Sequence, residues 1–233
     1  MPATVYLIPT VLAEGETSCL PAYILDAIKS CTVFFVENER TARRYVKLLW
    51  RKMVIDEYEW YNMKEFTTEV ALAFKQKIRE EKTIGIISEA GCPGVADPGQ
   101  QLVGLAQEMN AIIKPLVGPN AILMALMASG MNGQQFQFAG YLPIEPIQRA
   151  KVIKALENES KQKNCTQIFI ETPYRNNQLL ETLTKTCQPT TQICVAVDLT
   201  AKSEMVRTRT AQQWKTAMPQ LHKRPAIFLL YVA

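Results

Sequence analysis

Short apolar runs alternate with amphipathic helical patterns along the chain, and this alternation restricts the fold more than any other feature of the sequence. The runs, rich in β-branched and aromatic residues, span 4–8, 32–36, 83–87, 111–117, 166–170, 192–197, 205–208 and 227–232. Apolar residues at helical spacing lie between them, as in 66–81, 146–163, 176–186 and 212–218. Apolar runs bounded by turn residues are typical of buried strands in a largely parallel sheet. We therefore predict an α/β fold.

Two α/β domains in contact suit a chain of 233 residues. A sharp strand-to-helix turn at Leu116-Val117-Gly118-Pro119 predicts an N-terminal domain of residues 1–116 and a C-terminal domain of residues 117–233. The N-terminal sheet is predicted to be mostly parallel, and Ser18 is expected to cap its first helix. Closely spaced strands around residues 198–204 indicate a hairpin, so the C-terminal sheet is predicted to be mixed.

Composition excludes several classes of protein. The net charge of +4 permits a polyanionic partner without requiring one. The six cysteines have no zinc-ribbon spacing and His222 is the only histidine, so we expect no metal site and no disulfide scaffold. The longest apolar stretches, 121–128 and 226–233, are eight residues each, too short to cross a bilayer. No secretory signal is evident, and we predict a cytoplasmic protein that does not engage a membrane.

Glycine is concentrated around one strand-to-helix loop. Five of the ten glycines lie between Gly85 and Gly104, and the loop of residues 88–99 follows a predicted strand and precedes a predicted helix. Loops at the carboxyl ends of parallel strands are where open α/β sheets bind ligands. The loop has neither a phosphate-loop motif nor a G-x-G-x-x-G fingerprint, which disfavours nucleotide hydrolysis and ordinary dinucleotide binding. An ordinary connecting loop is the alternative interpretation.

Two further turns carry groups that suit a ligand. The turn Val117-Gly118-Pro119-Asn120 starts an apolar helix over residues 121–131, whose first N–H groups are free to bind polar atoms. At the end of the strand 166–170, Glu171 can accept hydrogen bonds and Arg175 can bind a phosphate. The alternative for this second turn is a helix cap with a solvated ion pair.

A basic stripe follows the second predicted strand. Its members recur at helical spacing and are Arg40, Arg43, Arg44, Lys47 and Arg51. Such a stripe suits a nucleic-acid backbone when it lies beside a ligand cleft. Elsewhere it is an ordinary solvated helix face, and both interpretations stay open here.

Together these motifs resemble the tetrapyrrole methylase superfamily of S-adenosylmethionine-dependent methyltransferases, and within it the ribosomal RNA small-subunit methyltransferase I family. The similarity runs along nearly the whole chain. The segments that carry it are Tyr6-Leu7-Ile8-Pro9-Thr10, Glu37-Asn38-Glu39-Arg40, Ser88-Glu89-Ala90-Gly91-Cys92-Pro93, Asp97-Pro98-Gly99, Gly118-Pro119-Asn120-Ala121, Ala128-Ser129-Gly130, Phe138-Ala139-Gly140-Tyr141-Leu142-Pro143 and Glu171-Thr172-Pro173-Tyr174-Arg175.

The resemblance implies S-adenosylmethionine as cofactor, in a cleft between two α/β domains, and usually a homodimer. It implies methylation of a cytidine ribose 2′-hydroxyl in ribosomal RNA, with the small ribosomal subunit as partner. The cofactor-binding residues that it implies are Pro9, Ser88, Glu89, Ala90, Gly91, Cys92, Gly118, Pro119, Asn120, Ala121, Glu171 and Thr172.

The substrate-binding residues predicted beside these are Arg40, Arg43, Lys47 and Arg175. Methyl transfer is an in-line displacement that depends mainly on alignment of donor and acceptor. A hydroxyl acceptor also benefits from a base. Glu37, Asp97 and Glu171 are the candidate bases near strand ends, and the sequence does not choose among them.

The chain departs from the family pattern at Leu12–Thr17, at Asp198–Ala201 and at Tyr174. These departures fall on the substrate side. The cofactor loop carries Glu89 where the family has Asp and Cys92 where it has Thr, and the cofactor motifs are otherwise retained. Two alternatives to RNA methylation therefore stay open: a methyltransferase acting on a tetrapyrrole-like small molecule, and a cofactor-binding module without catalysis.

Overall fold

The computed structural model describes residues 2–232 and divides the chain into two compact units, one up to Asn120 and one from Ala121 onward. The division follows Asn120, whereas the sequence suggested a boundary after Leu116. The turn of residues 117–120 belongs to the first unit because that unit holds it: the Val117 N–H donates to Tyr23 Oη at 2.7 Å.

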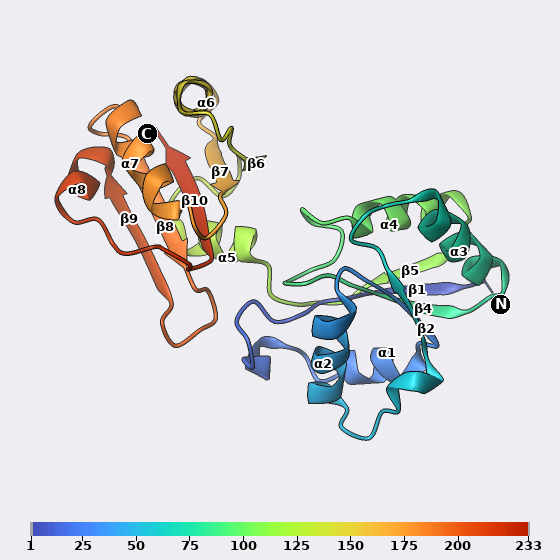
Figure 1. The fold of residues 1–233 in the computed structure, drawn as a ribbon. Helices are drawn as coiled ribbons and strands as arrows, with labels where there is room; N and C mark the ends of the chain where they lie inside the picture. The colour runs from blue at the N-terminus through green and yellow to red at the C-terminus, as the bar shows by residue number, and fades with distance from the viewer. Residues whose placement is uncertain (1, 233) are drawn as a thin grey trace. The chain divides into compact units, whose positions relative to one another are not determined.

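The first unit is an α/β layer structure around a parallel sheet (Figure 1). Its strands lie in the order β3-β2-β4-β1-β5, and every neighbouring pair is parallel. The elements are β1 (Thr4–Ile8), α1 (Ile24–Ser30), β2 (Val33–Val36), α2 (Glu39–Leu49), β3 (Glu59–Asn62), α3 (Thr68–Arg79), β4 (Thr83–Ile87), α4 (Gly99–Glu108) and β5 (Ile112–Pro115), with 3-10 turns at Thr17–Cys19 and Ile55–Glu57.

Both faces of this sheet are covered, because residues of both parities in the strands are apolar. Phe35 and Ile86 pack on one face with Phe74 of α3 and Leu102 of α4. The other face is covered by α1 and α2, and its core contains Phe34, Ile8, Ile24, Ile28 and Val46. All strands run in one direction, so their carboxyl ends, and the loops after β1, β2 and β4, share one edge of the sheet.

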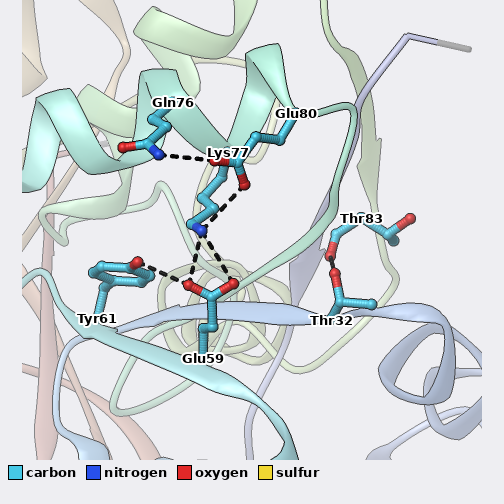
Figure 2. A network of polar contacts seen from close by, with 7 residues as sticks. All are labelled: Thr32, Glu59, Tyr61, Gln76, Lys77, Glu80 and Thr83. Carbon is cyan, nitrogen blue, oxygen red and sulfur yellow. Dashed lines mark hydrogen bonds and ion pairs between the residues drawn. The ribbon is translucent and has the colours of Figure 1, made fainter.

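Figure 2 shows how the edge strand β3 is attached to α3. The Lys77 ammonium of α3 lies 2.8 Å from Glu59 Oε2 and 3.1 Å from Glu80 Oε2. Tyr61 Oη donates to the same Glu59 oxygen at 2.9 Å. The bond to Glu59 raises the pKa of Lys77, and the bond from Lys77 lowers that of Glu59. This half-buried network secures a strand that has a neighbour on one side only.

The second unit has a mixed sheet in the order β6-β7-β10-β8-β9. Only β6 and β7 are parallel; the other neighbouring pairs are antiparallel. Its elements are α5 (Ala121–Ser129), β6 (Phe136–Tyr141), α6 (Pro146–Lys163), β7 (Thr166–Ile170), α7 (Asn176–Thr186), β8 (Gln192–Val197), β9 (Met205–Thr210), α8 (Ala211–Thr216) and β10 (Ala226–Tyr231). Phe169, Phe228 and Trp214 are fully or almost fully buried in its core.

The predicted α/β class, the parallel first sheet and the mixed second sheet with its β8–β9 hairpin are confirmed. The capping role of Ser18 was wrong: it lies in the 3-10 turn Thr17–Cys19, and α1 begins at Ile24. Strands β3 and β6 were not predicted. Both are edge strands whose sequences, Glu-Trp-Tyr-Asn and Phe-Gln-Phe-Ala-Gly-Tyr, alternate in polarity or contain glycine and so lack an apolar run.

Candidate functional site

The loop between β4 and α4 has a backbone fixed by one carboxylate. Asp97 Oδ1 accepts the N–H of Gly99 at 2.7 Å, and both its oxygens lie 3.0 Å from the N–H of Gly94. Gly91, Gly94 and Ala96 have positive φ angles of 73°, 84° and 60°. Burial raises the pKa of Asp97, against the opposing effect of these hydrogen bonds. The Asp97 carboxylate therefore shapes the loop from within.

Neighbouring elements hold the start of the same loop. The Glu89 N–H donates to Glu37 Oε2 at 2.9 Å, which joins the ends of β2 and β4. The Thr10 N–H donates to the Gly91 carbonyl at 2.9 Å, and Tyr45 Oη donates to the Pro9 carbonyl at 2.6 Å. Burial raises the pKa of Tyr45, so its hydroxyl keeps the proton that it donates. The end of β1, helix α2 and the β4–α4 loop therefore form one hydrogen-bonded assembly.

The turn of residues 117–120 packs against the same assembly. A Cβ atom on Gly118 would lie 2.1 Å from Cβ of Pro9, so only glycine fits this close approach. Cys92 Sγ donates to the carbonyls of Gly118 and Pro119, at 3.5 Å and 3.4 Å. Burial raises the pKa of the Cys92 thiol, which therefore stays protonated as a donor. The predicted cofactor residues Pro9, Gly91, Cys92, Gly118 and Pro119 are thus gathered in one place.

A pocket of about 610 Å³ opens beside this assembly, within the first unit. Its lining residues come from the loop after β1, from one face of α2 and from the start of the β4–α4 loop: Thr10, Val11, Leu12, Glu14, Gly15, Thr41, Ala42, Arg44, Tyr45, Leu48, Ser88, Glu89 and Ala90. Of the predicted cofactor residues, Ser88, Glu89 and Ala90 therefore face the pocket. The volume falls in the range of small-molecule sites.

The members of the basic stripe differ in whether other groups of the chain engage their side chains. Arg43 pairs with Glu39 at 2.8 Å and lies over the Trp60 ring, and Lys47 Nζ donates to the carbonyls of Arg51 and Met53. Arg40 is exposed at the start of α2.

A neighbouring face of α2 lines the pocket instead. Thr41, Arg44, Tyr45 and Leu48 share it at helical spacing. The charge pattern of α2 predicted Arg44 as a member of the stripe but did not predict Thr41, Tyr45 and Leu48 beside it. The signal for this face was the helical spacing of those three residues with Arg44.

In the second unit, Glu171 follows β7 and is 5% exposed. Its Oε1 accepts from Arg175 Nη2 at 2.7 Å and from the Thr172 N–H at 2.6 Å. Burial would raise the pKa of Glu171, but the bonds from Arg175 and Thr172 outweigh it and lower the pKa, so the group is ionised at neutral pH. Oε2 is buried and has no hydrogen-bond partner among the described residues. Glu171 therefore has an oxygen left to accept from a ligand.

The family model described as Tetrapyrrole (Corrin/Porphyrin) Methylases matches residues 15–214. The chain belongs to the tetrapyrrole methylase family. Among the described residues of this tetrapyrrole methylase, no group of three His, Cys, Asp or Glu is arranged to hold a metal ion. No helix between residues 2 and 232 is long and apolar enough to span a membrane.

Curated relatives of this tetrapyrrole methylase bear the name ribosomal RNA small subunit methyltransferase I. The protein from Bacillus subtilis is 28% identical over 85% of this chain and 64% of its own length. The Helicobacter pylori J99 protein is 30% identical over 76% of this chain and 64% of its own length. The chain thus spans slightly less than two thirds of these relatives.

Solved structures show the same fold at low sequence identity. The methyltransferase CobJ is 18% identical with a TM-score of 0.64, and the match covers 99% of this chain and 94% of CobJ. Uroporphyrin-III C-methyltransferase from Thermus thermophilus, complexed with S-adenosyl homocysteine, is 14% identical with a TM-score of 0.56, over 98% and 97% of the two chains. The fold of this tetrapyrrole methylase is therefore shared with both enzymes.

Proposed function

We propose that this protein is an S-adenosylmethionine-dependent methyltransferase that acts on RNA of the small ribosomal subunit, at the ribose 2′-hydroxyl of a cytidine. The observation that carries the proposal is the assembly around the β4–α4 loop, in which Glu37, Thr10 and Asp97 fix a strand-end loop beside an open pocket. The names of the relatives support RNA of the small ribosomal subunit as the substrate, and the cytidine 2′-hydroxyl rests on the family resemblance.

The residues present fit this cofactor. The amino and hydroxyl groups of S-adenosylmethionine need hydrogen-bond acceptors. The unpartnered Oε2 of Glu171 and the backbone carbonyls of the glycine-rich loop can both serve as acceptors. The residues of the first unit that are proposed to hold S-adenosylmethionine are Pro9, Ser88, Glu89, Ala90, Gly91, Cys92, Gly118, Pro119 and Asn120. Those of the second unit are Ala121, Glu171 and Thr172. The cofactor, once bound, supplies a methyl group on a sulfonium, which an aligned acceptor removes in one displacement.

All three candidate bases accept hydrogen bonds from the chain itself. Glu37 binds the Glu89 N–H, Asp97 binds those of Gly94 and Gly99, and Glu171 binds Arg175. We propose that these carboxylates position backbone and side chains, and that alignment contributes most of the rate. Glu37, Asp97 and Glu171 all stay candidates for the base that receives the proton of the acceptor hydroxyl.

The charges around the pocket support RNA over a tetrapyrrole-like acceptor. Arg44 is the only cation in the lining, and it is accompanied by the carboxylates Glu14 and Glu89. Corrin and porphyrin precursors carry several carboxylates, which this balance of charge would repel. A nucleotide carries one negative charge, which the single cation can pair with, and several donor groups, which the two carboxylates can accept.

Labelled S-adenosylmethionine tests the proposal directly. The purified protein is incubated with the labelled cofactor and small ribosomal subunits, total RNA or a metabolite extract, and cofactor binding is measured separately by calorimetry. We expect cofactor binding and label in the RNA of the small subunit. Label in a metabolite would establish the small-molecule alternative, and binding without transfer to any acceptor would establish the module without catalysis.

We further propose that the protein works in the cytoplasm as a homodimer. Of the predicted substrate-binding residues, Arg40 and Arg175 stay proposed to approach the substrate, whereas Arg43 and Lys47 are engaged by contacts within the first unit. The family resemblance supports the dimer, and the +4 charge is compatible with an RNA partner. Sedimentation equilibrium at micromolar protein should give twice the chain mass of 26.3 kDa; a single-chain mass would contradict the dimer.

A further inference from the structure

We propose that the pocket of the first unit receives one nucleotide of the RNA acceptor and that Arg44 binds its phosphate. This inference rests on the proposed function and deepens it, because it names the part of the chain that meets the acceptor. Its starting point is the pocket itself, whose volume of about 610 Å³ is sufficient for a nucleotide.

Arg44 is the basic residue of α2 that remains available inside the pocket. Arg43 is engaged by Glu39 and by the Trp60 ring, and Lys47 by two carbonyl groups at the end of the helix. Arg44 is exposed and lines the pocket, and its guanidinium makes no hydrogen bond or ion pair within residues 2–232. A guanidinium in this state binds a phosphate through two parallel hydrogen bonds.

The rest of the lining suits the other parts of a nucleotide. Leu48 is 49% exposed although it is aliphatic, and with Val11 and Leu12 it offers an apolar surface to a base. Glu14 and Glu89 are exposed, and no side-chain partner engages their carboxylates in the described part of the chain. They can accept hydrogen bonds from the amino group of a base or from a ribose hydroxyl.

The floor of the pocket connects it to the proposed chemistry. Ser88, Glu89 and Ala90 line the pocket and also begin the loop proposed to hold the cofactor. A nucleotide on the α2 side of these residues would therefore lie next to the methyl donor, as an in-line displacement requires.

Single substitutions of exposed residues test the assignment. Arg44→Gln should raise KM for small ribosomal subunits by about tenfold, with kcat and cofactor affinity unchanged, because one charged contact to the substrate is lost. It should also reduce the slope of log affinity against log salt by about 0.7. Arg44→Lys should recover part of the affinity. The matched control is Arg79→Gln, on the exposed side of α3 on the opposite face of the same sheet.

A second variant probes the pocket independently of Arg44. Leu48→Glu places a carboxylate in the lining at a half-exposed position, and we expect KM to rise by at least about tenfold while thermal stability is kept. The inference is overturned if Arg44→Gln and Leu48→Glu both behave like Arg79→Gln while the parent methylates the subunits. A parent that binds the cofactor but does not methylate RNA overturns the proposed function and this inference with it.

Discussion

Replacing Asp97 by alanine and by asparagine distinguishes a positioning role from proton transfer. Asp97 Oδ1 alone lies within hydrogen-bond distance of both loop donors, 2.7 Å from the Gly99 nitrogen and 3.0 Å from the Gly94 nitrogen. Asparagine keeps an oxygen at this position, whereas alanine removes it. The two variants therefore differ in whether the loop keeps its acceptor, and they share the loss of a group that can take a proton.

The structure allows the effect on stability to be worked out. A hydrogen bond to a charged group contributes about 1.5–3 kcal/mol. Asp97 is half-buried, so the lower value applies, and its two donors give a loss of about 3 kcal/mol for Asp97→Ala. Asp97→Asn should lose less, about 1 kcal/mol, because the two bonds to Oδ1 remain and only the contact of Oδ2 with the Gly94 N–H is lost.

The pH dependence has a definite sign. Burial raises the pKa of Asp97, so the folded chain binds this proton more tightly than the unfolded chain. Its contribution to stability therefore decreases as the pH rises from the acidic range toward neutrality. The stability of Asp97→Asn lacks this decrease. The difference in free energy of unfolding between the parent and Asp97→Asn should therefore become smaller as the pH rises over the same range.

Urea unfolding, calorimetry with S-adenosylmethionine and methyl transfer to small ribosomal subunits together check this reasoning. A loss below about 1 kcal/mol in Asp97→Ala would refute the assignment of the carboxylate to the loop. If Asp97→Asn folds and binds the cofactor normally but loses methyl transfer by more than about a hundredfold, Asp97 transfers a proton, as a general base does, and the positioning interpretation is wrong.

Two further predictions concern the framework of the first unit. Gly118→Ala should displace Pro9, because the added Cβ would lie 2.1 Å from it, and should weaken cofactor binding by at least about tenfold in calorimetry. Its control, Gly104→Ala in the open interior of α4, should leave binding intact and stabilise the fold by about 0.5–1 kcal/mol; equal binding in both variants would contradict the close approach. Lys77→Met should lower the melting temperature by about 2–4 °C, since Glu59 and Glu80 lose their shared cation. The Lys77 pKa is raised in the folded chain, so the difference in stability should be complete below about pH 10 and should then decrease gradually as the pH rises toward the higher pKa of the folded state. A difference independent of alkaline pH would mean that the ion pairs contribute nothing.

The local sequence was sufficient to predict the strands whose side chains are buried on both faces of the sheet. In β2, all four residues from Val33 to Val36 are buried, so its apolar run predicts a strand without knowledge of its neighbours. Strand β3 needs the tertiary structure: its residues are half-buried or exposed, and it is a strand because β2 pairs with it and Lys77 binds Glu59. Pairing with a distant segment has no local pattern to reveal it.

The features of the candidate site also fall into those that the sequence predicts and those that need the tertiary structure. The sequence by itself determined the α/β class, the glycine-rich loop after β4 and the motifs of the family, because each of these depends on residue types close together in the chain. Which charged groups are available depends on the tertiary structure, because partners far apart in sequence engage some of them and leave others free. Arg43 is held over Trp60, whereas Arg44, the next residue, faces a pocket whose other walls are the loops after β1 and β4. Two adjacent arginines have the same chemistry in a sequence, and only the direction in which the folded helix presents each one separates a structural contact from a binding group.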